Sequence, residues 1–265
     1  MTDAHDTAAP LVLRDDRDGV AWLRLNRPQK RNALSLAMLD ALAEAVEALR
    51  TDRDVRVVVL AAEGPVFCAG HDLVELRDGD GPKFYRDVFD RCSTLMQSLH
   101  RLPQPVIASV HGMATAAGCQ LVASCDLVVA GESARFATPG VNIGLFCSTP
   151  MVALSRVVAP RAALEMLLTG DAVDAATAHT LGLVNHVVAD DALAEATAAL
   201  ASRLSQRSRH VLALGKEAWY AQLNLPRARA YDYTTAMMVR NMMADDAAEG
   251  ISAFLERRPP QWKDR

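Results

Sequence analysis

Residues 105–126 read PVIASVHGMATAAGCQLVASCD, and the rest of the chain is organised around this stretch. Its apolar start, Val106 to Val110, is typical of a short buried strand, which His111-Gly112 interrupts. The small residues from Ala114 to Gly118 then let the backbone turn closely into a helix that runs to about Ser124. Because the first amides of a helix have no partner within it, this turn can direct N–H groups at an anion or a polarised carbonyl.

A second small-residue turn, Phe67 to Asp72, follows the apolar strand expected at Val55 to Ala61. Its sequence, FCAGHD, again places small residues where the backbone must turn. Two such turns can supply two backbone donors to one oxygen atom. Strands and helices alternate around both turns, which predicts parallel strands joined by right-handed crossovers and hence an α/β fold.

The remaining apolar patterns predict the other elements of this fold. We expect strands at 11–13, 20–25, 127–130, 135–137 and 184–188. We expect a helix that Ser35 caps, and further helices at 84–102, 149–158, 161–168 and 174–181. From Asp191 onward the chain is expected to be helical, with breaks near 205–208, 225–226 and 245.

The composition excludes several classes of protein. A net charge of −4 over 265 residues argues against a nucleic-acid binder, and no apolar run is long enough to cross a bilayer. The five cysteines include no C-x-x-C pair, so neither a disulfide framework nor a metal site is expected. Residues 1–10 are small and polar, which predicts a disordered tail rather than a signal peptide, and therefore a cytoplasmic protein.

The two turns also carry a resemblance to a known family. From about Leu11 to the C-terminus the chain resembles the crotonase (enoyl-CoA hydratase/isomerase) superfamily. In that family an F-x-A-G-x-D-L turn and an N/H-G-x-A-x-G-G-G-x-x-L helix start form an oxyanion hole for a thioester oxygen. The matching segments here are Phe67 to Leu73 and His111 to Leu121. Further runs resemble one subgroup of the superfamily, at 62–67, 118–126 and 136–142.

This resemblance implies the crotonase (ClpP/crotonase-like) fold, a spiral core of ββα-type units followed by a helical C-terminal trimerisation region. It divides the chain into an acyl-CoA-binding core at 11–200 and a helical region at 201–265. The implied assembly is a homotrimer or a dimer of trimers. The expected substrate or ligand is a coenzyme A thioester, with no permanently bound cofactor, no metal, and neither a nucleic acid nor a membrane as partner.

The resemblance assigns the oxyanion hole to the backbone amides of Ala69 and Ala117. It also implies the residues that contact the acyl-CoA: Arg31, Ala33, Ala69, Gly70, His71, Asp72, Leu73, Ala117, Gly118 and Phe146. In related proteins a basic residue of the C-terminal helices often meets the nucleotide phosphates. The basic candidates for that contact are Arg31, Lys216, Arg257 and Arg258.

The catalytic pair of the related hydratases is missing from this chain. Those enzymes hold a water molecule between two glutamates, and the corresponding positions are Gln120 and Gly140. An amide does not exchange a proton at useful pH, and glycine has no side chain. Because each lost general acid or base usually lowers a rate by about 10²–10⁴, ordinary hydration is expected to be very weak or absent. Simple double-bond isomerases are disfavoured as well, since they keep a glutamate at the second position.

Other groups could transfer a proton. His71 is the foremost of these because histidine titrates near neutrality, and Glu75, Cys147 and Ser148 are alternatives. A nucleophilic mechanism lacks support, since no G-x-S-x-G elbow occurs and no Ser-His-Asp set for a ClpP-like peptidase can be placed. The sequence therefore favours an acyl-CoA enzyme of fatty-acid metabolism, nominally a lyase or isomerase, that stabilises a thioester oxyanion or enolate with non-standard acid–base chemistry. Its rival is a catalytically silent acyl-CoA-binding or regulatory protein.

Overall fold

The computed structural model describes residues 9–265, and a six-stranded sheet forms its centre. The strand order is β1-β2-β3-β4-β6-β9, with β1 and β2 antiparallel and every later neighbour parallel, as the alternation of strands and helices predicted. The strands are β1 (Val12–Arg17), β2 (Val20–Leu25), β3 (Val57–Ala62), β4 (Val106–Val110), β6 (Leu127–Gly131) and β9 (His186–Val188). Most of the expected disordered tail at 1–10 lies outside the described residues.

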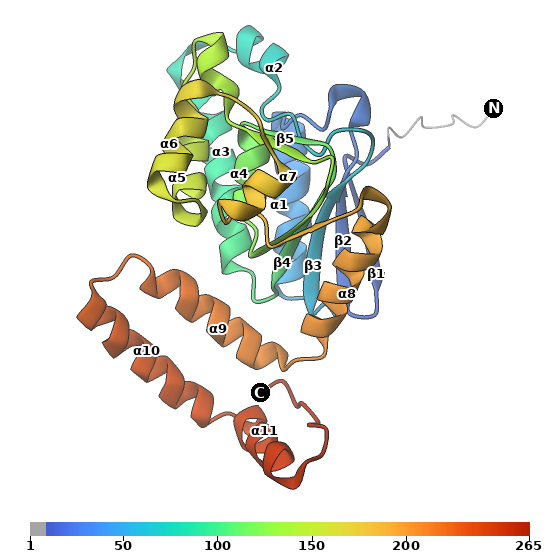
Figure 1. Cartoon of the computed structure of the whole chain (residues 1–265), viewed down its shortest axis with the longest axis vertical. Coiled ribbons are helices and arrows are strands. Elements are labelled where there is room, and N and C mark those ends of the chain that lie inside the picture. The colour runs from blue at the N-terminus through green and yellow to red at the C-terminus, as the bar shows by residue number, and fades with distance from the viewer. Residues whose placement is uncertain (1–8) are drawn as a thin grey trace, which may run out of the picture.

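The central strands β3, β4 and β6 are apolar on both faces because helices cover the sheet on both sides. Val58 and Leu60 of β3 face a large core shared with α1 (Leu36–Arg50), α3 (Gly81–Arg101) and α4 (Ala117–Ala123). Their neighbours Val57 and Val59 face the opposite way, toward a smaller core under α8 (Leu193–Ser205). Figure 1 shows these layers, with α8 alone on one side of the sheet.

A second, three-stranded sheet packs against the larger of the two cores. It has the order β5-β7-β8 and consists of β5 (Met113–Thr115), β7 (Arg135–Ala137) and β8 (Val173–Asp174). The strand β7 was expected, whereas β5 falls in the segment where we expected only a turn. Three residues give too short a pattern to recognise, and β5 exists because it pairs with β7 twenty residues later.

Short helices complete the core between these strands. Ser35 accepts a hydrogen bond from the Met38 N–H and caps α1 as predicted. The helix α2 (Leu73–Asp78) was not predicted, because it has no buried residue and therefore no apolar stripe. The others are η1 (Pro28–Lys30), η2 (Pro139–Ile143), α5 (Ser148–Val157), α6 (Pro160–Thr169), α7 (Ala175–Thr180) and η3 (Asp190–Ala192).

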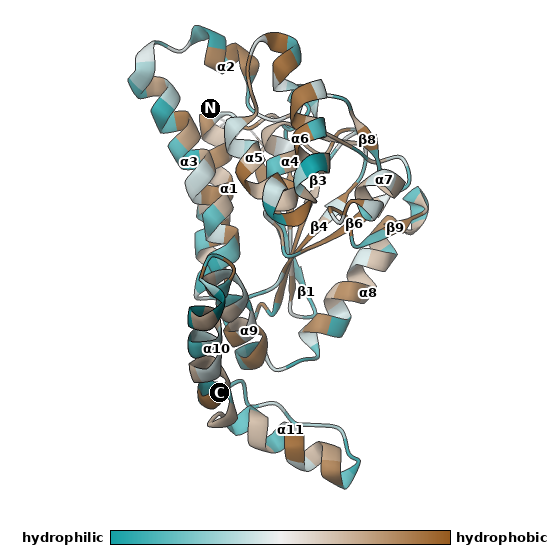
Figure 2. Cartoon of the chain, turned by 60° about the vertical axis from the view of Figure 1, so that its left-hand side comes forward, coloured by the Kyte–Doolittle hydropathy of each residue, from teal (hydrophilic) through white to brown (hydrophobic). Residues whose placement is uncertain are grey.

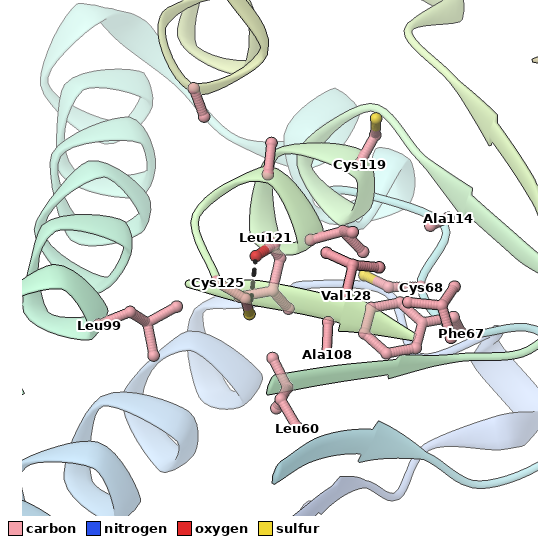
Figure 3. Close-up of a cluster of buried hydrophobic side chains, with 14 of the residues drawn as sticks. Leu60, Phe67, Cys68, Leu99, Ala108, Ala114, Cys119, Leu121, Cys125 and Val128 are labelled. Atoms are coloured by element: carbon pink, nitrogen blue, oxygen red, sulfur yellow. Dashed lines mark hydrogen bonds between the residues drawn. The ribbon is translucent and has the colours of Figure 1, made fainter. Parts of the chain in front are cut away.

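All seven residues of α4 are buried, so this helix forms the centre of the molecule. Figure 3 shows it above the sheet, with Phe67 and Cys68 of the first turn packed beside Val128. A Cβ on Gly118 would lie 2.3 Å from the carbonyl oxygen of Cys68. Only glycine therefore lets α4 approach the first turn so closely.

Three helices form an arm that extends from the core: α9 (Arg209–Gln222), α10 (Arg227–Met242) and α11 (Asp245–Glu256). Figure 1 shows α10 lying alongside α9, and α11 below the start of α9. The expected boundary at 200/201 falls inside α8, which packs on the sheet as part of the core. Within residues 9–265, no helix is long and apolar enough to cross a membrane, and no cluster of three or more His, Cys, Asp or Glu residues could hold a metal ion.

Candidate functional site

The two turns singled out in the sequence meet in the structure and are hydrogen-bonded to each other. The N–H of Cys68 donates to the carbonyl of Met113 at 3.1 Å, and the N–H of Thr115 donates to the carbonyl of Cys68 at 2.9 Å. The first turn follows β3, and the second joins β5 to α4. Two main-chain hydrogen bonds thus fix the first turn against β5, which leads directly into α4.

Gly70 brings the two turns into closer contact than any other residue would allow. It has φ +83°, and a Cβ on it would lie 2.9 Å from the Cβ of Ala116 and 3.2 Å from the backbone nitrogen of Ala117. Any side chain here would both strain the backbone and displace the start of α4. The backbone of the first turn consequently lies directly beside the Ala117 N–H.

The structure contradicts one of the two predicted oxyanion donors. The N–H of Ala69 already donates to the carbonyl of Arg31 at 3.0 Å, so it is not available to a ligand. Two residues later, the N–H of His71 has no acceptor among residues 9–265, and the same is true of Ala117 at the first position of α4. The sequence had no signal for this difference, because it depends on how the turn pairs with residues 31–34, far away in the chain.

The pairing with residues 31–34 also explains the direction of the His71 N–H. Leu34 donates its N–H to the carbonyl of Gly70 at 2.8 Å and accepts a hydrogen bond from the Asp72 N–H at 3.4 Å. His71 lies between these two bonds, opposite Leu34. Its own N–H therefore points away from Leu34, on the side that is free of main-chain partners.

Ala116, just before α4, adopts a strained backbone conformation. Its φ is 51° and its ψ is −118°, a region that glycine adopts readily and alanine rarely. Strain of this kind costs about 1–3 kcal/mol and persists only where the surroundings enforce it. Here the carbonyl of Ala137 accepts from the Ala116 N–H at 2.9 Å and holds the turn, which leaves the next N–H, that of Ala117, free.

The side chain of His71 lies half-buried beneath the turn, with both ring nitrogens shielded from solvent. Its ring meets Phe89 of α3 edge-on, with the ring centres 5.3 Å apart. Within the described chain neither ring nitrogen has a hydrogen-bond partner. Burial lowers the pKa of this histidine, so the imidazole is neutral at pH 7.

Gln120 lies one turn into α4, after Ala117, and it is 4% exposed. Its Oε1 atom is buried and has no partner among residues 9–265. A buried amide oxygen without a partner is costly, which marks this as a polar group kept for a ligand or for water rather than for packing.

Main chain from the following loop fills the second catalytic position. A Cβ on Gly140 would lie 2.8 Å from the carbonyl oxygen of Leu145 and 3.0 Å from the Sγ of Cys147. The N–H of Leu145 also donates to the carbonyl of Gly140 at 2.9 Å, which closes residues 140–145 into a compact turn. No side chain larger than hydrogen fits here unless this loop moves.

The carboxylates near the first turn have structural partners. Asp72 accepts from the N–H groups of Val74 and Glu75 at the start of α2 and forms an ion pair with Arg27 at 3.0 Å. Glu75 accepts from the N–H of Leu36 at 2.9 Å and thereby helps to cap α1. The Glu75 carboxylate, which the sequence suggested as an alternative acid, therefore has a structural role in capping α1.

The other candidates for covalent chemistry are not activated. Burial raises the pKa of the Cys147 thiol, and this effect outweighs the opposing influence of the Gly140 backbone. Ser148 donates its hydroxyl to the carbonyl of Phe146 at 3.4 Å. Neither side chain has the adjacent base that a nucleophile requires.

The residues predicted to contact acyl-CoA differ in exposure. Leu73 and Phe146 expose 54% and 41% of their surface, whereas Ala33 is buried. Arg31 is exposed and makes no ion pair in the described chain, so its guanidinium remains free for a phosphate. Beside it, a cleft of about 460 Å³ opens between η1 and α2 and is lined by Arg27, Lys30, Asp72, Val74 and Glu75, among others.

Two of the basic candidates in the arm are already paired. Lys216 is almost fully buried and donates to Asp126 at 2.6 Å and to the carbonyls of Leu99 and Gln104. Arg258 forms ion pairs with Glu249 and Glu256, both at 2.6 Å. Lys216 therefore cannot reach a nucleotide, and this part of the sequence interpretation is wrong.

Comparison with known proteins agrees with this geometry. A family model described as enoyl-CoA hydratase/isomerase matches residues 15–265. The chain belongs to the enoyl-CoA hydratase/isomerase family. The crotonase fold is confirmed by solved structures of that family, which superpose on nearly the whole chain.

Within the enoyl-CoA hydratase/isomerase family, three relatives illustrate the similarity. The mouse protein "Enoyl-CoA hydratase domain-containing protein 3, mitochondrial" is 47% identical over 93% of this chain and 82% of its own length. A crystal structure described as the enoyl-CoA hydratase of Mycobacterium smegmatis has a TM-score of 0.94 and 54% identity, over 96% of this chain and 99% of the other. The crystal structure of human enoyl-CoA hydratase domain-containing protein 3 has a TM-score of 0.92 and 46% identity, over 95% and 100%.

These relatives confirm one prediction and overturn another. The runs at 62–67, 118–126 and 136–142 indicated enoyl-CoA hydratase domain-containing protein 3 as the similar subgroup of the family, and this is confirmed. The cytoplasmic location inferred from the N-terminal composition is contradicted, since the relatives of this subgroup are named as mitochondrial proteins.

Proposed function

We propose that this protein binds acyl-CoA thioesters and directs the N–H groups of His71 and Ala117 at the thioester oxygen. The observation that carries the proposal is the pair of free amides on two turns that are hydrogen-bonded together. A preorganised donor aimed at a developing oxyanion typically contributes about 3 kcal/mol to its stabilisation. Such donors support enolate formation next to the thioester, and membership of the enoyl-CoA hydratase/isomerase family supports a role in acyl-CoA metabolism.

Ordinary hydration of an enoyl-CoA is not the reaction that we propose. It would need two carboxylates around a water molecule, and the corresponding positions hold Gln120 and Gly140. The space at Gly140 is occupied by the Leu145 carbonyl and the Cys147 thiol. The loop therefore carries no second acid or base and also leaves no room for one.

His71 remains our candidate for a proton-transfer side chain. The two ring nitrogens of its neutral imidazole have no partner in the part of the chain that the structure describes, and the ring belongs to the same turn as the free N–H. A neutral imidazole can accept a proton, although the apolar surroundings of this one disfavour the charged product. The same burial supports the rival, a catalytically silent acyl-CoA-binding protein, because it makes the ring a weak base.

We propose that coenzyme A lies across the loop at 31–34 and the first turn. Arg31 and Lys30 would meet its phosphates there, since both are exposed and neither makes an ion pair among residues 9–265. Leu73 and Phe146 would contact the pantetheine or acyl chain with their exposed apolar surfaces. No permanently bound cofactor enters this proposal.

Proton exchange at the acyl α-carbon distinguishes the two functions. An enzyme that forms the enolate exchanges the α-protons of a saturated acyl-CoA for deuterium in D₂O, whereas a silent binder does not. We expect binding by calorimetry together with measurable exchange by NMR. His71→Ala should abolish the exchange and retain the affinity, because the variant keeps its backbone N–H.

Crotonyl-CoA supplies the complementary test. We expect no loss of the conjugated thioester absorbance with the unmodified protein. Appreciable hydration would contradict our account of the missing glutamates. Binding without any α-proton exchange would establish the silent acyl-CoA-binding protein instead, and absence of binding would reject both functions.

A further inference from the structure

The chain after α11 turns back and follows that helix to its first residue. The reversal occurs at Arg257, which has φ 56°. The N–H of Gln261 then donates to Glu249 at 2.7 Å, and the ring of Trp262 lies 3.2 Å from the position of a Cβ on Gly250. At the end of the return, the carbonyl of Arg265 accepts from the Asp246 N–H at 3.2 Å.

Asp246 is a buried carboxylate that depends on this returning segment. It is 1% exposed and makes no ion pair with any described residue. Its oxygens accept hydrogen bonds from the N–H groups of Lys263 and Asp264 at 2.6 and 3.0 Å, and from the hydroxyl of Ser208. Without the returning segment this carboxylate would lose both main-chain donors and part of its cover, so its present burial is stable only because the segment supplies those hydrogen bonds.

Asp264 connects the same segment to the root of the arm. Its carboxylate accepts two hydrogen bonds from the Arg56 guanidinium, at 2.8 and 3.1 Å, and one from the Arg209 N–H at the start of α9. Arg56 also donates to the carbonyls of Ser205, the last residue of α8, and of Arg207 in the linker between α8 and α9. One arginine therefore joins the start of β3, the base of the arm and the chain end.

The helix α11 has few other contacts that could hold it in place. It buries only Asp246 and Ala253, and its neighbour α10 buries no residue at all. Its apolar side chains Phe254 and Leu255 are 82% and 73% exposed. Figure 2 shows α11 projecting from the arm, away from the core.

We propose that residues 257–265 form a strap that holds α11 to the root of the arm. The strap is attached to the core through the pairing of Asp264 with Arg56 and to α11 through the buried carboxylate of Asp246. When the strap is released, α11 separates from the root of the arm while the sheet and both turns of the candidate site stay folded. The orientation of the C-terminal helix is thus adjustable independently of the core.

Hydrogen exchange measured by mass spectrometry tests the strap. In Asp264→Ala and in a chain that lacks residues 262–265, we expect the amides of α11 to exchange at least about tenfold faster. Amides of β3 and β4 should exchange at the unmodified rate. Arg265→Ala is the matched control, because it removes an exposed ion pair with Asp245 from the same segment and should leave α11 unchanged.

The same exchange measurement is repeated on proteins that also carry Phe254→Glu/Leu255→Glu. In these proteins, contacts between copies of the chain cannot protect the amides of α11 from exchange. Unchanged exchange of α11 in both strap variants would overturn the proposal. Equal acceleration in α11, β3 and β4 would also overturn it, since the segment would then be part of the global fold. If the shortened chain does not fold, the Asp264→Ala protein decides the outcome.

Discussion

At the scale of single residues, Gly140 has a structural role in addition to replacing a carboxylate. A Cβ at this position would press against the Leu145 carbonyl and the Cys147 thiol. Gly140→Ala is therefore expected to lower the free energy of unfolding by about 1–3 kcal/mol, the usual cost of overpacking, as measured by urea denaturation.

Gly215 provides the matched control for this substitution. It lies inside α9, and a Cβ there would meet nothing within 4 Å. Gly215→Ala should raise the free energy of unfolding by about 0.5–1 kcal/mol, because alanine is the better helix former. If both variants shift stability in the same direction, the crowding at Gly140 is not what the structure indicates.

His71 gives the protein a stability that depends on pH. Burial holds its pKa in the folded state below the ordinary value of 6.5. As the pH falls through 6.5, the unfolded chain binds a proton that the folded chain does not, so the free energy of unfolding decreases. The decrease is complete only below the lowered folded-state pKa.

We expect His71→Leu to flatten this acid side of the stability profile. Denaturation at pH 7.5, 6.5, 5.5 and 5.0 should show a shallower fall than in the unmodified protein. Some slope should remain, because burial also lowers the pKa of His100. An identical slope in the two proteins would mean that His71 is protonated in the folded state as easily as in the unfolded chain.

At the scale of secondary-structure elements, α9 is attached to the core by a buried ion pair. Lys216 donates to Asp126 at 2.6 Å, and Tyr220, one turn later, donates to the other oxygen of the same carboxylate at 2.7 Å. Asp126 also accepts from the N–H of Val106 at the start of β4. The arm is thus anchored on the strand that leads to the second turn of the candidate site.

Lys216→Ala is expected to lower the free energy of unfolding by up to about 3–5 kcal/mol, because it leaves the part-buried Asp126 without its cation. Arg240→Ala serves as the control, since its pair with Glu217 is exposed and 3.7 Å long, and such pairs contribute within about 1 kcal/mol. Chemical denaturation of both variants makes the comparison. A loss below 1 kcal/mol for Lys216→Ala would show that α9 is held by its other contacts.

Prediction from sequence succeeded where an element is long enough to show a regular apolar pattern, or where a capping or helix-breaking residue marks its end. The helix that Ser35 caps, the parallel strands and the breaks at 205–208, 225–226 and 245 are all present. It failed where the structure depends on distant partners. The short strand β5 forms only against β7, and the N–H of Ala69 is unavailable only because Arg31 lies beside it. Which amides remain free is a property of these tertiary contacts.

At the scale of the whole molecule, the core and the arm differ in how they are stabilised. The sheet is covered by apolar helices on both faces, whereas α10 and α11 leave large apolar side chains in solvent. These side chains are Met238, Val239, Met242, Met243, Ile251, Phe254 and Leu255. Large apolar side chains exposed in this number on two successive helices are typical of a contact with another protein molecule, here a second copy of the chain.

We propose that the arm mediates association into a trimer or a dimer of trimers. Phe254→Glu/Leu255→Glu should then reduce the mass in solution to that of a monomer, because charged residues would be buried at the contact. Light scattering after size-exclusion chromatography measures this directly. Lys83→Gln/Arg86→Gln changes the net charge by the same −2 on exposed residues of α3 and should leave the mass unchanged. If the unmodified protein is already a monomer, or if the Glu variant keeps its full mass, the arm is not the contact. If both variants dissociate, net charge rather than the apolar surface controls assembly.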